Sequence, residues 1–325
     1  RNLYARCLVV ALLCPLAMPR VSTAQATAAA EPTPAEAIEA MLVDAYPDDT
    51  GPGAALLVID DGEIVYRGAR GMADVELRVP LTPEHVFRLG SITKQFTAAA
   101  ILLLEEQGKL SADEPITQYL PDYPTHGHEI TIEHLLTHTS GIFSYTSIPG
   151  YMDQPVRRDL TTDELVESFE HLPMDFAPGE RWSYSNSGYV LLGAIIEAVS
   201  GQSYAEFIQQ LIFEPLGMEH SHYGGHQIIP NRASGYTAGG DGYVNAAYLS
   251  MTQPHAAGAL LSTVDDLARW DAALYTDRLL GAASRQRLFE PFELNDGEST
   301  NYAFGFTIGD LRGRPMVSHG GGIFG

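Results

Sequence analysis

The spacing of apolar residues predicts where the ordered part of the chain begins. Residues 27–37 are rich in Ala, Thr and Pro, a composition typical of a linker. After them Ile38, Met41, Leu42 and Tyr46 occupy positions that share one face of a helix. We therefore expect a linker up to residue 37 and a helix after it.

The pattern then changes from strands to a buried helix. Residues 53–71 contain two runs of β-forming residues around an Asp-Asp-Gly turn at 60–62, which predicts a β-hairpin. Residues 92–104 are apolar on nearly every side of a helix, as in a helix surrounded by core, and Gly108 is a suitable end for it.

The remainder of the chain is first helix-rich and then strand-rich. A Ser/Thr cap with Asp265 and Asp266 in the following turn predicts the start of a late helix. Residues 301–325 are typical of two strands around a turn. Strands near both ends indicate an α/β domain closed by its two termini, with helices inserted. We expect residues 38–110 and 253–325 to form the α/β part and residues 111–252 the mainly helical part.

The first 26 residues have the features of an export signal. Two arginines precede an apolar run at 8–18, and small residues follow up to Ala26. This predicts a cleavable signal peptide cut after Ala26 and a secreted or periplasmic protein. The run is too short for a stable membrane anchor. Cys7 and Cys14 both lie in this segment, so the mature protein would have neither a disulfide nor a thiol nucleophile.

The charge balance excludes one class of partner. The formal net charge is −22, and no basic face is visible that a phosphate backbone would need. We expect no nucleic-acid binding, no cofactor, and a small molecule or peptide as substrate. The oligomeric state does not follow from the sequence.

The sequence RLGSITKQF (88–96) contains a serine three residues before one of the chain's two lysines, Lys94 and Lys109. Residues three apart share a helix face, so Ser91 Oγ and Lys94 Nζ can meet. A lysine, unlike an arginine, becomes a neutral base when it is desolvated. Ser91 beside a neutral Lys94 would be an activated nucleophile.

Two further short motifs carry polar groups suited to this chemistry. Tyr184 and Asn186 immediately precede a buried helix pattern. A lysine cation nearby would favour the phenolate of Tyr184, which could then move the serine proton, and Asn186 can both donate and accept hydrogen bonds. His319 on a strand-like run is followed by three glycines, whose N–H groups could complete an oxyanion hole with the N–H of Ser91.

Ser-x-x-Lys, Tyr-x-Asn and a cation-x-Gly strand, in this order, resemble the serine β-lactamase-like family. It contains class C β-lactamases, DD-carboxypeptidases, D-amino-acid peptidases and a group of esterases. Supporting stretches that are similar to the family lie at 130–142, 213–218 and 256–270. The resemblance implies an antiparallel sheet flanked by helices, with an inserted helical subdomain, and covers about residue 38 to residue 325.

The resemblance also implies a role for each motif residue. Ser91 is expected to be acylated, with Lys94 and Tyr184 as its proton-transfer partners. Asn186 would hold the substrate amide or carbonyl, and His319 would occupy the cation position of the third motif, beside Gly321. The N–H groups of Ser91 and Gly322 are expected to form the oxyanion hole.

Two departures from the family pattern bear on substrate and fold. The third motif is His-Gly-Gly at 319–321 instead of Lys-Thr-Gly or His-Thr-Gly. The missing threonine hydroxyl weakens recognition of a substrate carboxylate and favours an esterase or a peptidase of other selectivity. The chain also stops after the third-motif strand, where the family adds two strands and a helix, so we expect a truncated chain whose sheet is not closed.

Other interpretations remain open at this stage. His220, His222 and His226 offer a zinc-like spacing. The chain could also be a catalytically silent relative that binds cell-wall fragments or a partner. If His319 supplies a histidinium, activity on anionic substrates should fall as the pH rises through about 6.5.

Overall fold

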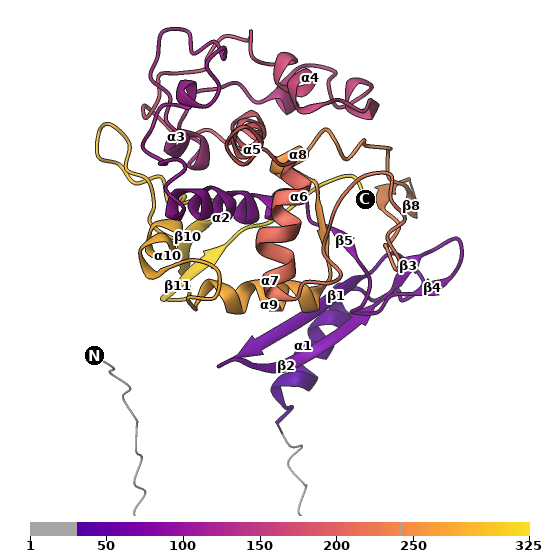
Figure 1. Cartoon of the computed structure of the whole chain (residues 1–325). Helices are drawn as coiled ribbons and strands as arrows, with labels where there is room; N and C mark the ends of the chain where they lie inside the picture. Colours follow the sequence, from indigo (N-terminus) through magenta and orange to yellow (C-terminus); the bar gives the residue numbers. More distant parts are fainter. Residues whose placement is uncertain (1–30, 241) are drawn as a thin grey trace, which may run out of the picture.

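The computed structural model describes residues 31–240 and 242–325 (Figure 1). The predicted signal peptide lies outside the described residues. The helices are α1 Pro34–Ala45, α2 Thr93–Glu106, α3 Ile132–Leu136, α4 Thr162–Glu167, α5 Asn186–Ser200, α6 Tyr204–Ile208, α7 Glu214–Leu216, α8 His255–Gly258, α9 Val264–Leu274 and α10 Ala282–Leu288. The strands are β1 Ala54–Asp60, β2 Glu63–Arg70, β3 Met72–Asp74, β4 Val79–Pro80, β5 Phe87–Arg88, β6 His222–Tyr223, β7 Tyr236–Gly239, β8 Gly242–Asn245, β9 Leu260–Ser262, β10 Thr307–Leu311 and β11 Arg314–Ser318.

The predicted linker is shorter than expected at its C-terminal end. Helix α1 begins at Pro34, because Thr33 caps it with a hydrogen bond from the Glu36 N–H and Pro34 suits the first helical turn. The boundary at residue 37 was therefore wrong by about one helical turn. The predicted hairpin is confirmed: β1 and β2 pair antiparallel, and α1 packs against β2 (Figure 1).

The centre of the core is built from α2, α5 and α8, which pack against one another (Figure 1). Helix α2 is buried along most of its length, as the apolar run predicted. Phe96 stacks on Trp270 of α9 with ring centroids 4.1 Å apart, and the Trp270 indole N–H donates to Gln95 Oε1. These contacts tie α2 to α9, whose predicted Thr263 cap is also present.

The middle of the chain is less purely helical than expected. Residues 111–252 contain helices α3 to α7, but they also contribute strands β6, β7 and β8. Strand β6 pairs with β9 from the C-terminal part, and β9 pairs on its other side with β5. The alternation of apolar and polar residues did not predict these strands, because each is only two to four residues long.

The sheets are small and their strand pairs are antiparallel, in agreement with the antiparallel fold class. Strands β10 and β11 form the predicted C-terminal hairpin. Within the part of the chain that the structure describes, this hairpin pairs with itself and not with β1–β2. The two termini therefore do not close one sheet, in agreement with the expectation of an unclosed sheet and not with that of a domain closed by its termini.

Within residues 31–240 and 242–325, no helix combines the length and the apolarity that crossing a bilayer requires.

Candidate active site

Ser91 is held at the junction between a strand and the central helix. Strand β5 is hydrogen-bonded to β9, and the Leu89 N–H donates to Leu260 O over 2.9 Å. One 3₁₀ turn, Gly90–Ile92, then leads directly into α2. Gly90 has φ of +53°, a conformation that glycine adopts without strain. The turn places Ser91 on the wall of a cavity.

Lys94 lies one turn further along α2, and its side chain is fully buried. Its Nζ is 3.3 Å from Ser91 Oγ, 2.8 Å from Asn186 Oδ1 and 2.9 Å from the carbonyl oxygen of Ala257 in α8. The predicted meeting of Ser91 and Lys94 is therefore present. Three different segments converge on this one nitrogen.

Burial lowers the pKa of Lys94 well below its ordinary value. A neutral amine has two N–H donors and one lone pair. The Asn186 and Ala257 oxygens can only accept, so they take the two N–H groups. The lone pair is then left for the hydroxyl proton of Ser91. In its neutral form, Lys94 is therefore placed to accept the Ser91 proton.

Tyr184 lies beside both residues but in a different protonation state from the one predicted. Lys94 Nζ is 4.7 Å from the centre of the Tyr184 ring. Burial raises the pKa of Tyr184 to about 12, against a smaller lowering by its hydrogen bond with Ser91. The prediction of a favoured phenolate was wrong, because burial of Tyr184 disfavours its charged form. Tyr184 is a phenol that can donate a proton.

Asn186 is the first residue of α5 and is engaged by protein groups. Its Oδ1 accepts from Lys94, and its Nδ2 donates to Thr146 Oγ1 over 3.1 Å. Its backbone N–H donates to Ser144 Oγ. Asn186 also lines the cavity. In this structure its side chain positions Lys94 as well as facing the space where a substrate would bind.

The glycine segment after β11 approaches the Ser91 turn very closely. A Cβ atom placed on Gly321 would lie 1.9 Å from Leu89 O, and one on Gly90 would lie 3.0 Å from the Gly322 nitrogen. Only glycine permits the first approach. The backbones of residues 90–91 and 321–322 thus lie side by side, as an oxyanion hole built from the Ser91 and Gly322 N–H groups requires.

His319 lies at the start of this glycine segment. Its Nε2 is 2.8 Å from the Tyr302 hydroxyl and its Nδ1 is 2.6 Å from Gly320 O. Burial lowers the pKa of His319 below 6.5. The titration predicted near pH 6.5 is therefore displaced to lower pH, and the imidazole is neutral at pH 7.

The cavity beside Ser91 has a volume of about 290 Å³. Among the described residues that line it, none has a charged side chain. The loop at 142–155 contributes Tyr145, Thr146 and Met152. The stretch at 223–248 contributes to an adjoining cavity of about 320 Å³, which shares Leu249 with the first.

Sequence reasoning missed two residues that contact the site. His138 and Tyr302 link Tyr184 to His319, and both are buried. His138 lies in a Thr-His-Thr-Ser-Gly stretch that was used only as a family marker. Its positive φ of 61° is a backbone feature that the sequence does not display.

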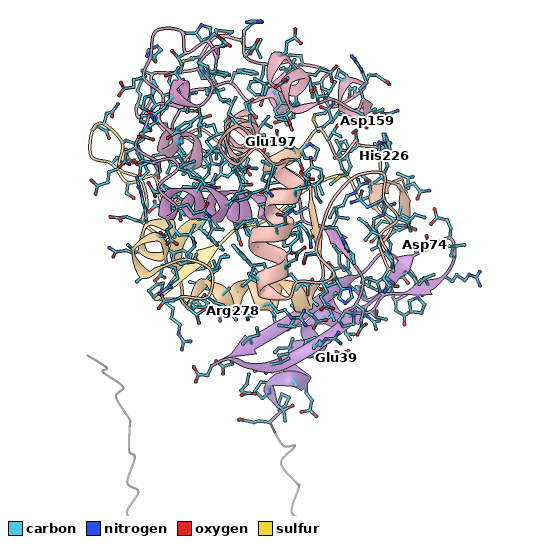
Figure 2. The ribbon with its side chains drawn as sticks, viewed as in Figure 1. Glu39, Asp74, Asp159, Glu197, His226 and Arg278 are labelled. Atoms are coloured by element: carbon cyan, nitrogen blue, oxygen red, sulfur yellow. The ribbon has the colours of Figure 1, made fainter. Side chains whose placement is uncertain are left out.

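The three histidines with zinc-like spacing do not converge. His222 is in β6, the backbone N–H of His220 donates to Asp266, and His226 Nε2 lies 3.2 Å from Asp159 Oδ2 at the surface (Figure 2). Within the described residues, no group of three or more His, Cys, Asp or Glu side chains is arranged to hold a metal ion.

A buried helix that begins with Ser-x-x-Lys, among helices and small antiparallel sheets, defines the class of β-lactamase-like proteins. The chain belongs to the Beta-lactamase family, whose model matches residues 39–325.

Relatives within this family have diverse names. The chain is 36% identical over 286 residues to penicillin-binding protein 4* of Bacillus subtilis, covering 82% of this chain and 62% of that protein. It is 40% identical over 179 residues to esterase EstB of Burkholderia gladioli, covering 51% of this chain and 45% of that protein.

A solved structure supports the same fold. D-amino acid amidase from Ochrobactrum anthropi, complexed with D-phenylalanine, matches with a TM-score of 0.74 at 28% identity, over 88% of this chain and 84% of that one. The chain spans less than two thirds of the length of the two curated relatives.

Proposed function

We propose that this protein is a serine hydrolase that forms an acyl-enzyme on Ser91 and acts on a small, uncharged ester or amide. The observation that carries the proposal is the contact set of Lys94. Its two N–H donors are used by carbonyl oxygens, which leaves its lone pair 3.3 Å from Ser91 Oγ. This is the geometry of an activated nucleophile.

The acylation step follows from this geometry. Ser91 Oγ bonds to the carbonyl carbon of the substrate, and its proton passes to Lys94 Nζ. The carbonyl oxygen becomes an oxyanion that accepts from the N–H groups of Ser91 and Gly322. When the carbonyl re-forms, the bond to the leaving group breaks. The leaving group takes the proton, which Lys94 returns through the Tyr184 hydroxyl.

Deacylation repeats these steps with water. A water molecule gives one proton to Lys94, its oxygen attacks the acyl carbon, and the bond to Ser91 Oγ breaks as that oxygen regains a proton. The products are a carboxylic acid and free enzyme. No group outside the Ser91, Lys94 and Tyr184 cluster is needed for proton transfer in either half-reaction.

The substrate class follows from the cavity wall. Met152, Val156, Leu249 and Phe324 supply apolar surface, and no charged side chain lines the cavity among the described residues. An acyl group with a free carboxylate or ammonium would lose its hydration without a partner there. A neutral acyl group fits better, which favours the esterase-like activity suggested by the name of one relative.

Serine-directed labelling tests the proposal. We expect a fluorophosphonate to label the purified full-length protein on Ser91, as located by peptide mass spectrometry. Lys94→Ala should abolish the label, whereas Lys109→Ala, which changes the chain's other and exposed lysine, should keep it. A well-folded protein without label would indicate a catalytically silent binding protein instead.

We also propose that the protein is exported, on the basis of its first 26 residues. N-terminal sequencing of the protein from its native cells should give Thr27 as the first residue. Recovery of uncleaved protein from the cytoplasm would contradict export.

A further inference from the structure

A series of hydrogen bonds connects the Tyr184–Asn186 motif with the glycine segment that follows His319. The Ser185 N–H lies 3.2 Å from His138 Nδ1, and His138 Nε2 lies 3.2 Å from the Tyr302 hydroxyl. Tyr302 is in turn 2.8 Å from His319 Nε2, and His319 Nδ1 is 2.6 Å from Gly320 O. Four bonds in series thus join the segment that carries Tyr184 to the glycine segment.

When both imidazoles are neutral, the two ends of this series of hydrogen bonds determine the direction of every bond. A backbone N–H can only donate, so His138 Nδ1 accepts from Ser185 and the proton of His138 is on Nε2. A carbonyl oxygen can only accept, so the proton of His319 is on Nδ1. His319 Nε2 must then accept. The Tyr302 hydroxyl then provides a partner for each imidazole, because it accepts from His138 and donates its single proton to His319.

A proton added to His319 would disrupt this order. Protonated Nε2 would point an N–H at Tyr302, which already accepts from His138, and the phenolic proton would have to leave His319 for its other partner, the Tyr189 hydroxyl. The titratable groups near His319 are Lys94, Tyr184, Tyr302 and His138, and none of them gives it a negative charge. Burial of His138 and Tyr302 further disfavours charged forms.

The last bond of the chain acts on the glycine segment. The Nδ1–H group of His319 holds the Gly320 carbonyl, which sets the plane of the peptide leading to Gly321. The backbone of Gly321 approaches Leu89 O so closely that no side chain would fit there. Because this contact confines Gly321, we expect the orientation of the Gly320 peptide to affect the position of the Gly322 N–H beside Ser91.

His138 also holds the other side of the site. Its carbonyl oxygen accepts from the Ser183 N–H over 2.9 Å, while its ring accepts from the Ser185 N–H. Its ring centre lies 4.2 Å from that of Tyr184. His138 thus accepts hydrogen bonds from the backbone on both sides of Tyr184. Through Tyr302, it also connects this backbone segment to His319.

We propose that His138 and Tyr302 are positioning residues that keep His319 a neutral imidazole bound to the Gly320 carbonyl, so that His319 orients the oxyanion-hole segment instead of supplying a cation. The effect on catalysis rests on the proposed acyl-enzyme function, but the tautomer of His319 does not. The two can therefore be tested separately.

The first test measures His319 itself. In protein with ¹⁵N-labelled histidine, the His319 signals, assigned by their loss in His319→Asn, should show a neutral ring with the proton on Nδ1 at pH 7. Tyr302→Phe removes the donor to Nε2, so the His319 pKa should rise by about 0.5 to 1 pH unit. Tyr275→Phe, at an exposed tyrosine, should leave it unchanged. A protonated ring in the parent, or an unchanged titration in Tyr302→Phe, would overturn the proposal.

The second test separates orientation from charge and does not require Tyr302→Phe to fold. In His319→Asn the side-chain amide can still donate near the Nδ1 position, whereas His319→Lys supplies a cation. On a neutral p-nitrophenyl ester we expect His319→Asn to keep kcat within about tenfold of the parent and His319→Lys to lose more. The reverse order would support the cation role.

Fluorophosphonate labelling distinguishes the two proposals. If Ser91 is not labelled but His319 is neutral with its proton on Nδ1, the hydrolase proposal fails and the hydrogen-bond chain stands. If Ser91 is labelled and His319 is a cation, the reverse holds.

Discussion

The two sides of the candidate site control their polar groups by different physical means. On the α2 side, Lys94 is fully buried, and desolvation sets its proton affinity. On the glycine side, His319 is partly exposed, and the bonds to Tyr302 and Gly320 set its orientation. In the proposed mechanism, burial sets the basicity of Lys94, whereas hydrogen-bond direction orients the oxyanion-hole segment. Substitutions should affect proton transfer on the first side and geometry on the second.

The largest effect is expected at the buried base. Lys94→Ala removes the proton acceptor of Ser91, so kcat for a p-nitrophenyl ester should fall by about 10³-fold or more. Lys109→Ala is the matched control: this lysine is exposed and lies beyond the end of α2, so the variant should retain parent activity. Equal activity of the two variants would show that Lys94 is not the proton acceptor of Ser91.

Tyr184→Phe should have the next largest effect. It removes the hydroxyl that returns the proton to the leaving group but keeps the ring against His138. We expect kcat to fall by about 10²-fold. The loss should be smaller for a nitrophenolate leaving group, which needs no proton, than for an alkyl alcohol. A loss independent of the leaving group would place Tyr184 elsewhere in the mechanism.

On the glycine side, Gly321→Ala tests geometry without touching a titratable group. The added methyl group would lie 1.9 Å from Leu89 O, so the backbone must move and displace the Gly322 N–H. We expect kcat to fall by about ten- to a hundredfold with the activity–pH profile unchanged. Gly242→Ala, where the added methyl meets open space, is the control. A shifted profile would mean that the two sides are not independent.

The smallest effect concerns stability. In the folded protein the pKa of Lys94 is lowered, whereas the unfolded chain has the ordinary value near 10.4. Between these two values the unfolded state binds more protons, so the free energy of unfolding should rise with pH, by up to about 1.4 kcal/mol per unit from this group. Denaturant unfolding at several pH values should show the slope in the parent and its loss in Lys94→Met. An identical slope in both proteins would mean that Lys94 is protonated when folded.

Local patterns predicted much of this molecule because they depend on neighbouring residues. The β1–β2 hairpin, the buried helix α2 and the pairing of Ser91 with Lys94 follow from side-chain periodicity and the three-residue spacing. The start of α1 and the two- to four-residue strands β6 to β8 did not follow, because capping and tertiary pairing decide elements this short.

The protonation states could not be predicted in the same way. The sequence indicated that Lys94 and Tyr184 would be partners, but not which of them would hold the proton. That depends on how deeply each is buried, and so on the packing of α2, α5 and α8 around them. The role of His138 depends on Tyr302, which is 164 residues away in the chain.

By itself, the sequence determined the chemical groups of the site and their order along the chain. Short motifs specify which side chains share a helix turn and where glycine permits a close backbone approach. Only the tertiary structure decided the protonation states that we assign to Lys94, Tyr184 and His319. Desolvation and hydrogen-bond direction, which decide these states, arise from residues far apart in the chain.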